Sequence, residues 1–156
     1  SVIGVDNAPA MIARAREQLN DPRARFECAD LTEFAVTDAK VIVLNFVMQF
    51  LPPAARLPLL QRLRSQMRSD GLLIVSEKTH QSDAVLQKFY DGTHLAWKRA
   101  NGYSELEVSQ KRQSLEQVMI VDSEEIHNQR FSDAGFAHSQ TWFRCMNWAS
   151  FLVEPE

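Results

Sequence analysis

The chain has 156 residues, with 17 basic and 20 acidic side chains, and its formal net charge is −3. Hydrophobic residues make up 45% and charged residues 24%, which is the composition of a folded globular chain rather than a disordered one. The mild negative charge argues against a protein that mainly coats nucleic acid or an anionic membrane. No apolar stretch approaches the ~18 residues of a membrane span, and no basic-then-apolar signal sequence opens the chain.

Cysteine and histidine are too few and too scattered to indicate a disulfide framework or a metal centre. Two cysteines, Cys28 and Cys145, cannot build such a framework. The four histidines, at positions 80, 94, 127 and 138, show no metal-ligand spacing. We therefore expect no metal, and we expect the reducing environment of the cytoplasm.

The sequence begins directly with a pattern typical of a buried element. Val2–Val5 is short, apolar and β-branched, and no polar lead precedes it. The chain has only five glycines, none of them near another, so it contains no glycine-rich turn. We expect the sequence to enter its fold midway, with a first strand and a glycine-rich turn belonging before Val2.

Four short segments in the first half of the chain are predicted to be strands. They are Val2–Val5, Arg25–Cys28, Val41–Leu44 and Leu72–Val75. The last two are continuous apolar runs, which is typical of parallel strands buried on both faces.

Apolar residues with helical spacing lie between these strands. One set, behind Pro9, is Met11, Ile12, Ala15 and Leu19, and the other is Leu59, Leu60, Leu63 and Met67. Pro58 is expected in the first turn of the second helix, where its missing N–H costs nothing. Ser69-Asp70-Gly71 is expected to turn the chain into the next strand. This alternation predicts an α/β fold with a mostly parallel sheet and right-handed crossovers.

The second half of the chain has a different pattern. Residues 85–97 have helical spacing, and Ser104 with Glu107 forms a capping box for a helix from Glu105 to about 117. Segment 82–117 is therefore predicted to be a helical insertion. Asp122 and Glu125 indicate another capped helix that ends at Gly135. Residues 137–145 and 148–153 are expected to form a C-terminal antiparallel hairpin.

Four arginines, at positions 56, 62, 64 and 68, lie close together in the sequence. They allow two interpretations, a basic face or an ordinary solvated helix surface. The solvated surface is favoured, because isolated surface charges are the rule.

Polar side chains lie at the ends of the four predicted strands. They are Asp6-Asn7, Asp30, Asn45 and Glu77, in that order. Open α/β sheets bind ligands outside the carboxyl ends of their strands. A carboxylate can accept both hydroxyls of a ribose, and an Asp with nearby backbone can hold the edge of an adenine. The set predicts an adenosine-containing ligand. The alternative is that these residues only form turns and caps, which Asp and Asn favour.

Several stretches resemble a known family. IGVDNAPAMIARAREQL, ECADLTEF, VIVLNFVMQFLPP and RSDGLLIVSEK resemble the class I S-adenosylmethionine (SAM)-dependent methyltransferases. KRANGYSELEVSQKRQSLEQVMIVDS, and the tail DSEEIHNQRFSDAGFAHSQTWFRCMNW, resemble more specifically the carboxy-S-adenosyl-L-methionine synthase family. The resemblance implies a Rossmann-like class I methyltransferase fold over a single domain, 1–156, that lacks its first strand and glycine-rich turn.

The resemblance also implies a reaction. Members of the family convert SAM and prephenate to carboxy-SAM and phenylpyruvate, for the wobble uridine (5-oxyacetic acid) modification of tRNA. The sulfonium polarises its methyl group, so that a proton is lost to give an ylide, and the ylide carbon captures the carbon dioxide released from prephenate. An arginine is suited to hold the new carboxylate through a planar, bidentate fork.

The family's carboxylate-binding arginine matches Arg112, to which the resemblance gives the catalytic role of a carboxylate clamp. The alternative for Arg112 is a surface pair with Glu116. The other ligand-binding positions of the family match Asp6, Asn7, Asp30, Leu31 and Asn45. The family's N-terminal tyrosine and Gly-Cys-Ser turn have no counterpart here. Tyr103 is expected to pack beside the capping box and is retained as a possible neighbour of the site.

Two other functions remain open from the sequence, an ordinary SAM-dependent methyltransferase on a small molecule or RNA, and an inactive SAM-binding fragment. The resemblance implies a cytoplasmic homodimer, whose interface we expect at 82–117. It also implies that a separate tRNA carboxymethyltransferase uses the product. We expect no direct binding of nucleic acid and no association with a membrane.

Overall fold

A computed structural model of the chain describes residues 1–107, 109 and 118–156. These residues form two compact units, 1–36 and 37–156, and each unit is described by itself. The prediction of a single domain over 1–156 stays a prediction.

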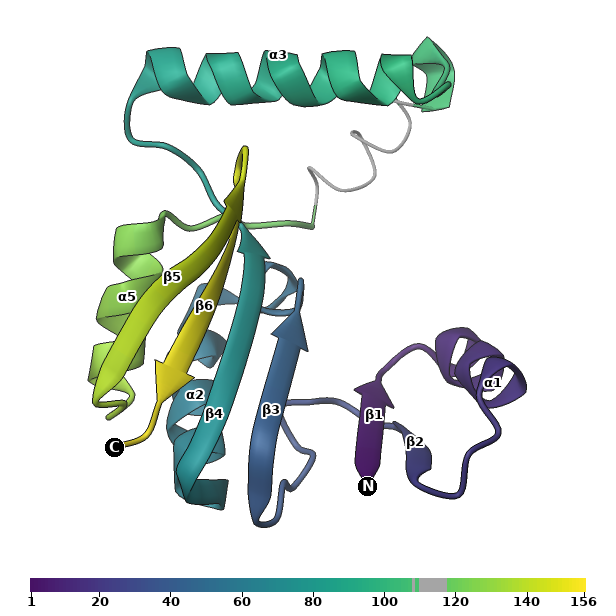
Figure 1. The fold of residues 1–156 in the computed structure, drawn as a ribbon, viewed down its shortest axis with the longest axis vertical. Coiled ribbons are helices and arrows are strands. Elements are labelled where there is room, and N and C mark those ends of the chain that lie inside the picture. The colour runs from purple at the N-terminus through teal and green to yellow at the C-terminus, as the bar shows by residue number, and fades with distance from the viewer. Residues whose placement is uncertain (108, 110–117) are drawn as a thin grey trace. The chain divides into compact units, whose positions relative to one another are not determined.

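The first unit is a strand–helix–strand crossover. It contains β1 (Val2–Asp6), α1 (Pro9–Gln18) and β2 (Ala24–Cys28) (Figure 1). The two strands are parallel and in register from Val2 opposite Ala24 to Asp6 opposite Cys28. Pro9 lies in the first turn of α1, where the missing N–H removes no helical hydrogen bond. The predicted strand–helix–strand order is confirmed here.

The second unit contains a four-stranded sheet in the order β3-β4-β6-β5. Its strands are β3 (Ala39–Asn45), β4 (Met67–Lys78), β5 (His138–Cys145) and β6 (Trp148–Glu154). β3 and β4 are parallel, whereas β6 runs antiparallel to both β4 and β5. The structure therefore confirms the α/β class and the antiparallel hairpin at the C-terminus.

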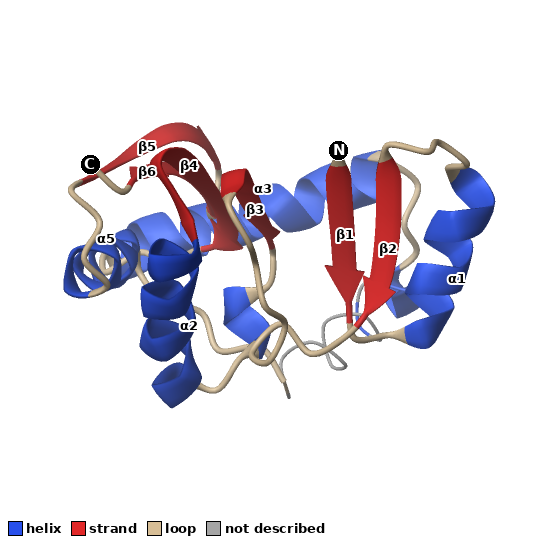
Figure 2. Ribbon diagram, turned by 90° about the horizontal axis from the view of Figure 1, so that it is seen from below, coloured by secondary structure: helices blue, strands red, loops and turns tan. Residues whose placement is uncertain are grey.

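The helices of the second unit are η1 (Met48–Phe50), α2 (Pro53–Gln66), α3 (Ala84–Ala100) and α5 (Glu124–Asp133). Figure 2 shows α2 and α5 on the same side of the four-stranded sheet. The core lies between these helices and the sheet, and its fully buried side chains include Leu60, Leu63, Leu73, Val75, Phe131, Phe151 and Val153. Each such side chain contributes ~1.5–3 kcal/mol to folding through its removal from water.

Three predictions about the α2–β4 region are wrong. α2 begins at Pro53, so Pro58 lies inside the helix and not in its first turn. Met67 is the first residue of β4 rather than part of the helix, and it pairs with Ala39. Ser69-Asp70-Gly71 lies within β4, next to a shift in the β3–β4 register. A Cβ on Gly71 would lie 2.9 Å from the Arg68 carbonyl oxygen, so this glycine is needed for a close approach and not for a turn.

The helix starts of the second half are close to those predicted. The Ser104 Oγ and backbone N–H both donate to the Glu107 carboxylate, at 2.7 and 2.8 Å, which confirms the capping box. α5 is capped by Ser123, whose Oγ accepts from the Ile126 N–H, and not by Asp122. Gly135 has a φ of +90° just after this helix, in agreement with the predicted end.

The helices of the described residues include none that is both long and apolar enough to cross a membrane. Residues 105–107 and 109 are helical, as predicted. The rest of the helix predicted to run to residue 117 lies outside the described residues.

Replacing Pro58 with alanine is expected to stabilise the protein by about 1 kcal/mol or more. Alanine restores an N–H donor toward the Ala54 carbonyl and removes the clash of the proline ring with the preceding turn. Pro58 is exposed, so its ring contributes little packing. Urea unfolding measures the effect. Pro53→Ala, at the first helical position, is the matched control and is expected to change stability much less. Equal effects of the two variants would contradict the assignment of Pro58 to the helix interior.

Candidate functional site

The carboxyl ends of β1 and β2 bring the first group of predicted ligand contacts together. The Ala29 N–H donates to the Asp6 carbonyl oxygen at 3.1 Å, so Asp6 and Asn7 lie beside the residues that lead to Asp30. The Asp6 Oδ1 accepts the Ala8 N–H at 2.7 Å, which turns the chain from β1 into α1. Asp6, Asn7 and Asp30 are exposed at this edge of the first unit.

Asp30 is held by the residue two positions after it. Its Oδ1 accepts the Thr32 Oγ–H at 2.7 Å and the Thr32 N–H at 2.8 Å. These hydrogen bonds, the side-chain one first, hold the pKa of the Asp30 carboxyl below its usual value. Leu31, which lies between Asp30 and Thr32 in the sequence, is half-buried. The edge therefore presents two oriented carboxyl groups, an arrangement that can accept hydrogen bonds from hydroxyl and amino groups of a ligand.

Asn45 ends β3 in the second unit, opposite Ser76 of β4. It is exposed, and the residue after it leaves the strand abruptly. Phe46 has a φ of +55°, in the left-handed region that a residue with a side chain rarely adopts. The Phe46 N–H donates to the Ser76 carbonyl oxygen at 2.7 Å. Such a conformation costs of order 1–3 kcal/mol and persists only where neighbouring contacts enforce it.

Glu77 was predicted to follow a strand and to face a ligand with the other polar strand ends. It lies instead within β4 and is fully buried. Its Oε1 accepts the N–H groups of Val47 and Met48, at 2.9 and 2.7 Å, and its Oε2 accepts the Gln49 N–H at 3.2 Å. Burial raises the pKa of Glu77 to about 7, although the three amides and the charge of Arg56 oppose that change.

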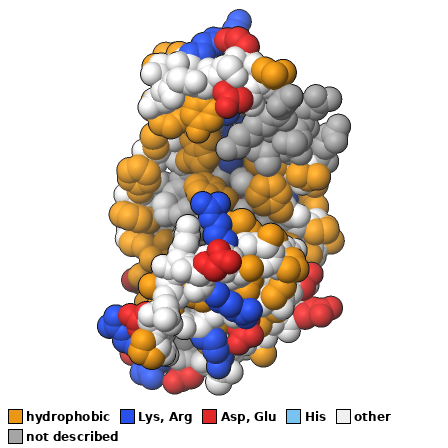
Figure 3. All heavy atoms as spheres, turned by 90° about the vertical axis from the view of Figure 1, so that its right-hand side faces the viewer, with side chains coloured by type: hydrophobic (Ala, Val, Ile, Leu, Met, Phe, Trp, Pro, Cys, Tyr) orange, Lys and Arg blue, Asp and Glu red, His pale blue; other side chains and the backbone are white. Residues whose placement is uncertain are grey.

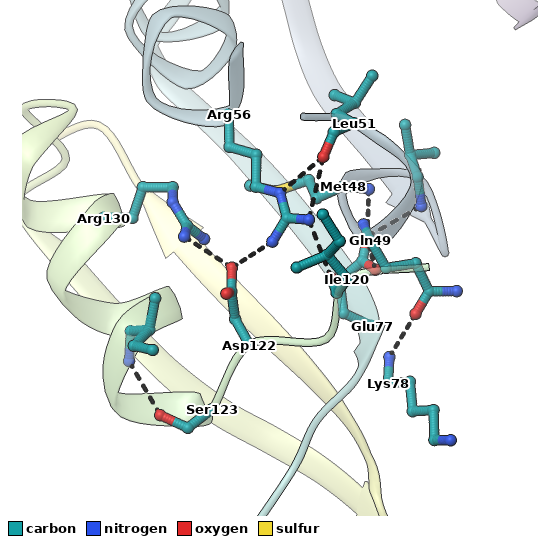
Figure 4. A network of polar contacts seen from close by, with 12 residues as sticks. Met48, Gln49, Leu51, Arg56, Glu77, Lys78, Ile120, Asp122, Ser123 and Arg130 are labelled. Atoms are coloured by element: carbon teal, nitrogen blue, oxygen red, sulfur yellow. Dashed lines mark hydrogen bonds and ion pairs between the residues drawn. The ribbon is translucent and has the colours of Figure 1, made fainter. Parts of the chain in front are cut away.

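Arg56 belongs to a buried network that the sequence did not reveal (Figure 4). Its guanidinium donates to the carbonyl oxygens of Leu51 and Ile120 and pairs with Asp122. Asp122 also pairs with Arg130 of α5, at 2.6 Å. The interpretation of Arg56 as part of a solvated surface is wrong, since this side chain is fully buried.

His127 of α5 is buried in contact with the rings of Phe131 and Phe151. Burial, and then the nearby positive charge of Arg130, lower the pKa of His127 to about 4, while Asp122 acts in the opposite direction. The imidazole is therefore neutral at physiological pH and serves as a packing element.

The remaining predicted site residues have different outcomes. Arg112 lies outside the described residues, so its role as a carboxylate clamp stays a prediction. Tyr103 is partly exposed, and its N–H donates to the Lys98 carbonyl oxygen at 3.2 Å. Arg99 pairs with Glu105 at 2.6 Å on the surface.

Charged side chains and possible metal ligands were the remaining candidates for a site in the described part of the chain. On the face of the molecule drawn in Figure 3, basic and acidic side chains are interspersed with hydrophobic ones. Of the four clustered arginines, Arg64 donates to two carbonyl oxygens and Arg68 pairs with Asp70. The described residues include no group of three or more His, Cys, Asp or Glu side chains that could hold a metal ion.

Comparison with known proteins finds relatives along almost the whole chain. Residues 1–71 match the family model described as a methyltransferase domain. The carboxy-S-adenosyl-L-methionine synthase of Geobacter metallireducens is 48% identical to this chain over 97% of it, and that of Shewanella denitrificans is 44% identical over 97%. The chain is thus similar to carboxy-S-adenosyl-L-methionine synthases over almost all of its own length. It spans 64% of the length of each of these synthases.

Solved structures confirm the class I methyltransferase fold that was predicted for this chain. Human N-acetylserotonin methyltransferase in complex with SAM matches with a TM-score of 0.65, at 15% identity, over 97% of this chain and 39% of that one. The mitomycin 7-O-methyltransferase MmcR matches with a TM-score of 0.68, at 14% identity, over 97% of this chain and 41% of that one. At these identities the likeness shows the fold alone, which is the class I methyltransferase fold.

Glu77 and His127 are expected to give opposite dependences of stability on pH. The folded state binds the Glu77 proton more tightly than the unfolded state does, because burial raises the pKa of this carboxyl from 4.5 to about 7. Its contribution to stability is therefore full below pH 4.5 and is lost as the pH rises to about 7. The pKa of His127 falls from 6.5 to about 4, so its contribution is full above pH 6.5 and is lost as the pH falls to about 4.

Urea unfolding of wild type, Glu77→Gln and His127→Gln between pH 4 and 7.5 separates the two effects. The stability of wild type minus that of Glu77→Gln is expected to fall as the pH rises, and the difference for His127→Gln is expected to increase. Each change has an upper limit of about 3 kcal/mol. Differences that do not vary with pH would contradict the burial of both groups in the folded state.

Proposed function

We propose that this chain comes from an enzyme that converts SAM and prephenate to carboxy-SAM and phenylpyruvate. The observation that carries the proposal is the 48% identity, over 97% of the chain, with a relative named carboxy-S-adenosyl-L-methionine synthase. Its class I methyltransferase fold, shared with a protein solved in complex with SAM, supports SAM as the substrate.

The geometry of the first unit supports SAM as a ligand. Asp6 is an exposed carboxyl group at the end of β1, where it is suited to accept the two ribose hydroxyls. Asp30, whose pKa is lowered by Thr32, and the adjoining backbone of Leu31 are suited to the edge of the adenine. Asn7 would supply an amide donor and an acceptor to the rest of the ligand. Asn45 of the second unit is proposed as a ligand contact from the family resemblance alone.

The proposed reaction balances in atoms and charge. Prephenate loses carbon dioxide and hydroxide and becomes phenylpyruvate, with aromatisation of its ring. The SAM methyl group loses a proton, which leaves with the hydroxide as water, and the resulting ylide carbon forms a bond to the carbon dioxide. Arg112 would hold the new carboxylate through two parallel N–H···O contacts, which a single point charge does not provide.

The proposal extends to the partners of the whole protein. We propose that it acts in the cytoplasm, and that a separate carboxymethyltransferase transfers the product to the wobble uridine of tRNA. We also propose a homodimer that buries one face of α3. Four large apolar side chains of this helix are exposed, and they are Val85, Leu86, Phe89 and Trp97. Val85 and Phe89 line a shallow groove of about 550 Å³ together with Lys88, Gly92, Thr93 and Ala96.

Mass spectrometry of the ligand extracted from the purified protein tests the proposed reaction. The expected ligand has the mass of SAM plus carbon dioxide, and purified protein supplied with SAM and prephenate should release phenylpyruvate. Extraction of unmodified SAM, with transfer of its methyl group to an added acceptor, would identify an ordinary methyltransferase instead. Binding of SAM without either reaction would identify an inactive SAM-binding protein.

Arg112→Ala is expected to abolish the preference for carboxy-SAM over SAM while the protein keeps its fold. The loss is expected to be about 10- to 100-fold in relative affinity, since a hydrogen bond to a charged group contributes ~1.5–3 kcal/mol. Calorimetry with the two ligands measures this preference, and circular dichroism follows the fold. Arg99→Ala, which removes an exposed arginine already paired with Glu105, is the matched control. An unchanged preference in Arg112→Ala would reject the carboxylate-clamp role.

A further inference from the structure

We propose that Glu77 is a positioning residue for the ligand-facing side chain of Asn45, and that it acts by holding the turn that follows Asn45. The inference rests on the proposed function, because it takes Asn45 as a contact to SAM. Neither the sequence pattern nor the family resemblance assigned this role to Glu77.

Glu77 cannot perform this role by touching the same ligand as Asn45. Asn45 lies opposite Ser76 in the parallel β3–β4 register, so the side chains of these two residues share one face of the sheet. Glu77 is the next residue along β4, and its side chain therefore points to the other face, which is buried. Any influence of Glu77 on Asn45 passes through the backbone.

The backbone contacts that carry this influence are continuous. The four successive N–H groups after Asn45 all donate to two neighbouring residues of β4. The Phe46 N–H donates to the Ser76 carbonyl oxygen, and the N–H groups of residues 47–49 donate to the Glu77 carboxylate (Figure 4). Asn45 is thus the last strand residue before a turn whose first four N–H groups are all held by β4.

The backbone at Phe46 is strained, and the contacts of Glu77 are needed to keep it in this conformation. A left-handed φ at a phenylalanine is unfavourable and would relax toward an extended or right-handed helical conformation without support. Relaxation at Phe46 would rotate the peptide that joins it to Asn45 and would redirect the Asn45 side chain. An apolar side chain at position 77 would leave three buried or half-buried amides without an acceptor.

Contacts at the far end of the turn do not replace Glu77. The Gln49 carbonyl oxygen accepts the Ile120 N–H, and Arg56 donates to the Leu51 carbonyl oxygen. These contacts fix residues 49–51. The N–H groups of Phe50 and Leu51 donate to the carbonyl oxygens of Val47 and Met48, but these bonds lie within the turn and do not join it to β4. Glu77 therefore determines the part of the turn that adjoins Asn45.

A double-mutant cycle on SAM binding tests the inference with the purified protein. The variants are Glu77→Gln, Asn45→Ala and the double substitution, with Kd measured by calorimetry. Gln retains the size of the side chain but presents an amide donor to the Gln49 N–H. We expect Glu77→Gln to raise the Kd about tenfold, in line with a lost hydrogen bond to the ligand. In the Asn45→Ala background, Glu77→Gln should raise the Kd no further, because its effect passes through Asn45.

Val153→Ala is the matched control for loss of stability. Val153 is fully buried in β6 opposite Leu73, which precedes Glu77 by four residues along β4, and the contacts to the turn described above do not include it. It should lower the thermal midpoint without changing the Kd. If Glu77→Gln fails to fold, Glu77→Asp, which keeps the charge but is shorter by one methylene, takes its place in the same cycle.

The outcomes separate this inference from the proposed function. An unchanged Kd in Glu77→Gln, or equal effects of Glu77→Gln in both backgrounds, would overturn the positioning role while wild-type binding of SAM leaves the proposed function intact. Wild-type protein that does not bind SAM would overturn both. A Kd that rises only in the presence of Asn45 supports the inference.

Discussion

The buried guanidinium of Arg56 is the interaction on which the second unit most depends. It extends from α2 to the carbonyl oxygens of Leu51 and Ile120 and to the carboxylate of Asp122. Asp122 in turn pairs with Arg130 of α5. One side chain thus joins two helices, the end of the η1 turn and the segment that enters α5. Removal of one member of such a network leaves buried charge unpaired, which is more costly than the loss of one contact.

Arg56 and Glu77 act on opposite ends of the same turn. Glu77 accepts the amides at its start, and Arg56 donates to a carbonyl oxygen at its end. Two buried polar side chains therefore hold the two ends of a short segment whose Met48 side chain packs in the core. The positive charge of Arg56 also stabilises the Glu77 carboxylate, although burial has the larger effect on the pKa of Glu77. Stability and the conformation at the end of β3 are consequently coupled through the same pair of residues.

The fold was predictable to the extent that it follows from local hydrophobic pattern. The continuous apolar runs at Val41–Leu44 and Leu72–Val75 indicated parallel strands, and they form the parallel β3–β4 pair. Their predicted burial on both faces is wrong for β3, because the side chains of Val41 and Val43 are exposed. The sequence pattern gave the wrong position for Pro58 and the wrong environment for Arg56. Pro58 was placed at a helix start, but the Pro52-Pro53 pair already starts α2. Arg56 was assigned to the surface by its residue type, because its partners Ile120 and Asp122 are more than sixty residues away in the sequence.

The roles of Asp6 and Asp30 in the candidate site were also only partly predictable from the sequence pattern. Turn formation and ligand binding were treated as competing interpretations of Asp6 and Asp30. The structure shows the turn role, since Asp6 accepts the Ala8 N–H and Asp30 accepts from Thr32. These bonds also hold each carboxylate in one orientation at the carboxyl edge of β1 and β2. A side chain that is already oriented loses less conformational entropy when a ligand binds. Turn formation is therefore a physical reason for these residues to be effective ligand contacts, and a sequence pattern that indicates one role does not count against the other.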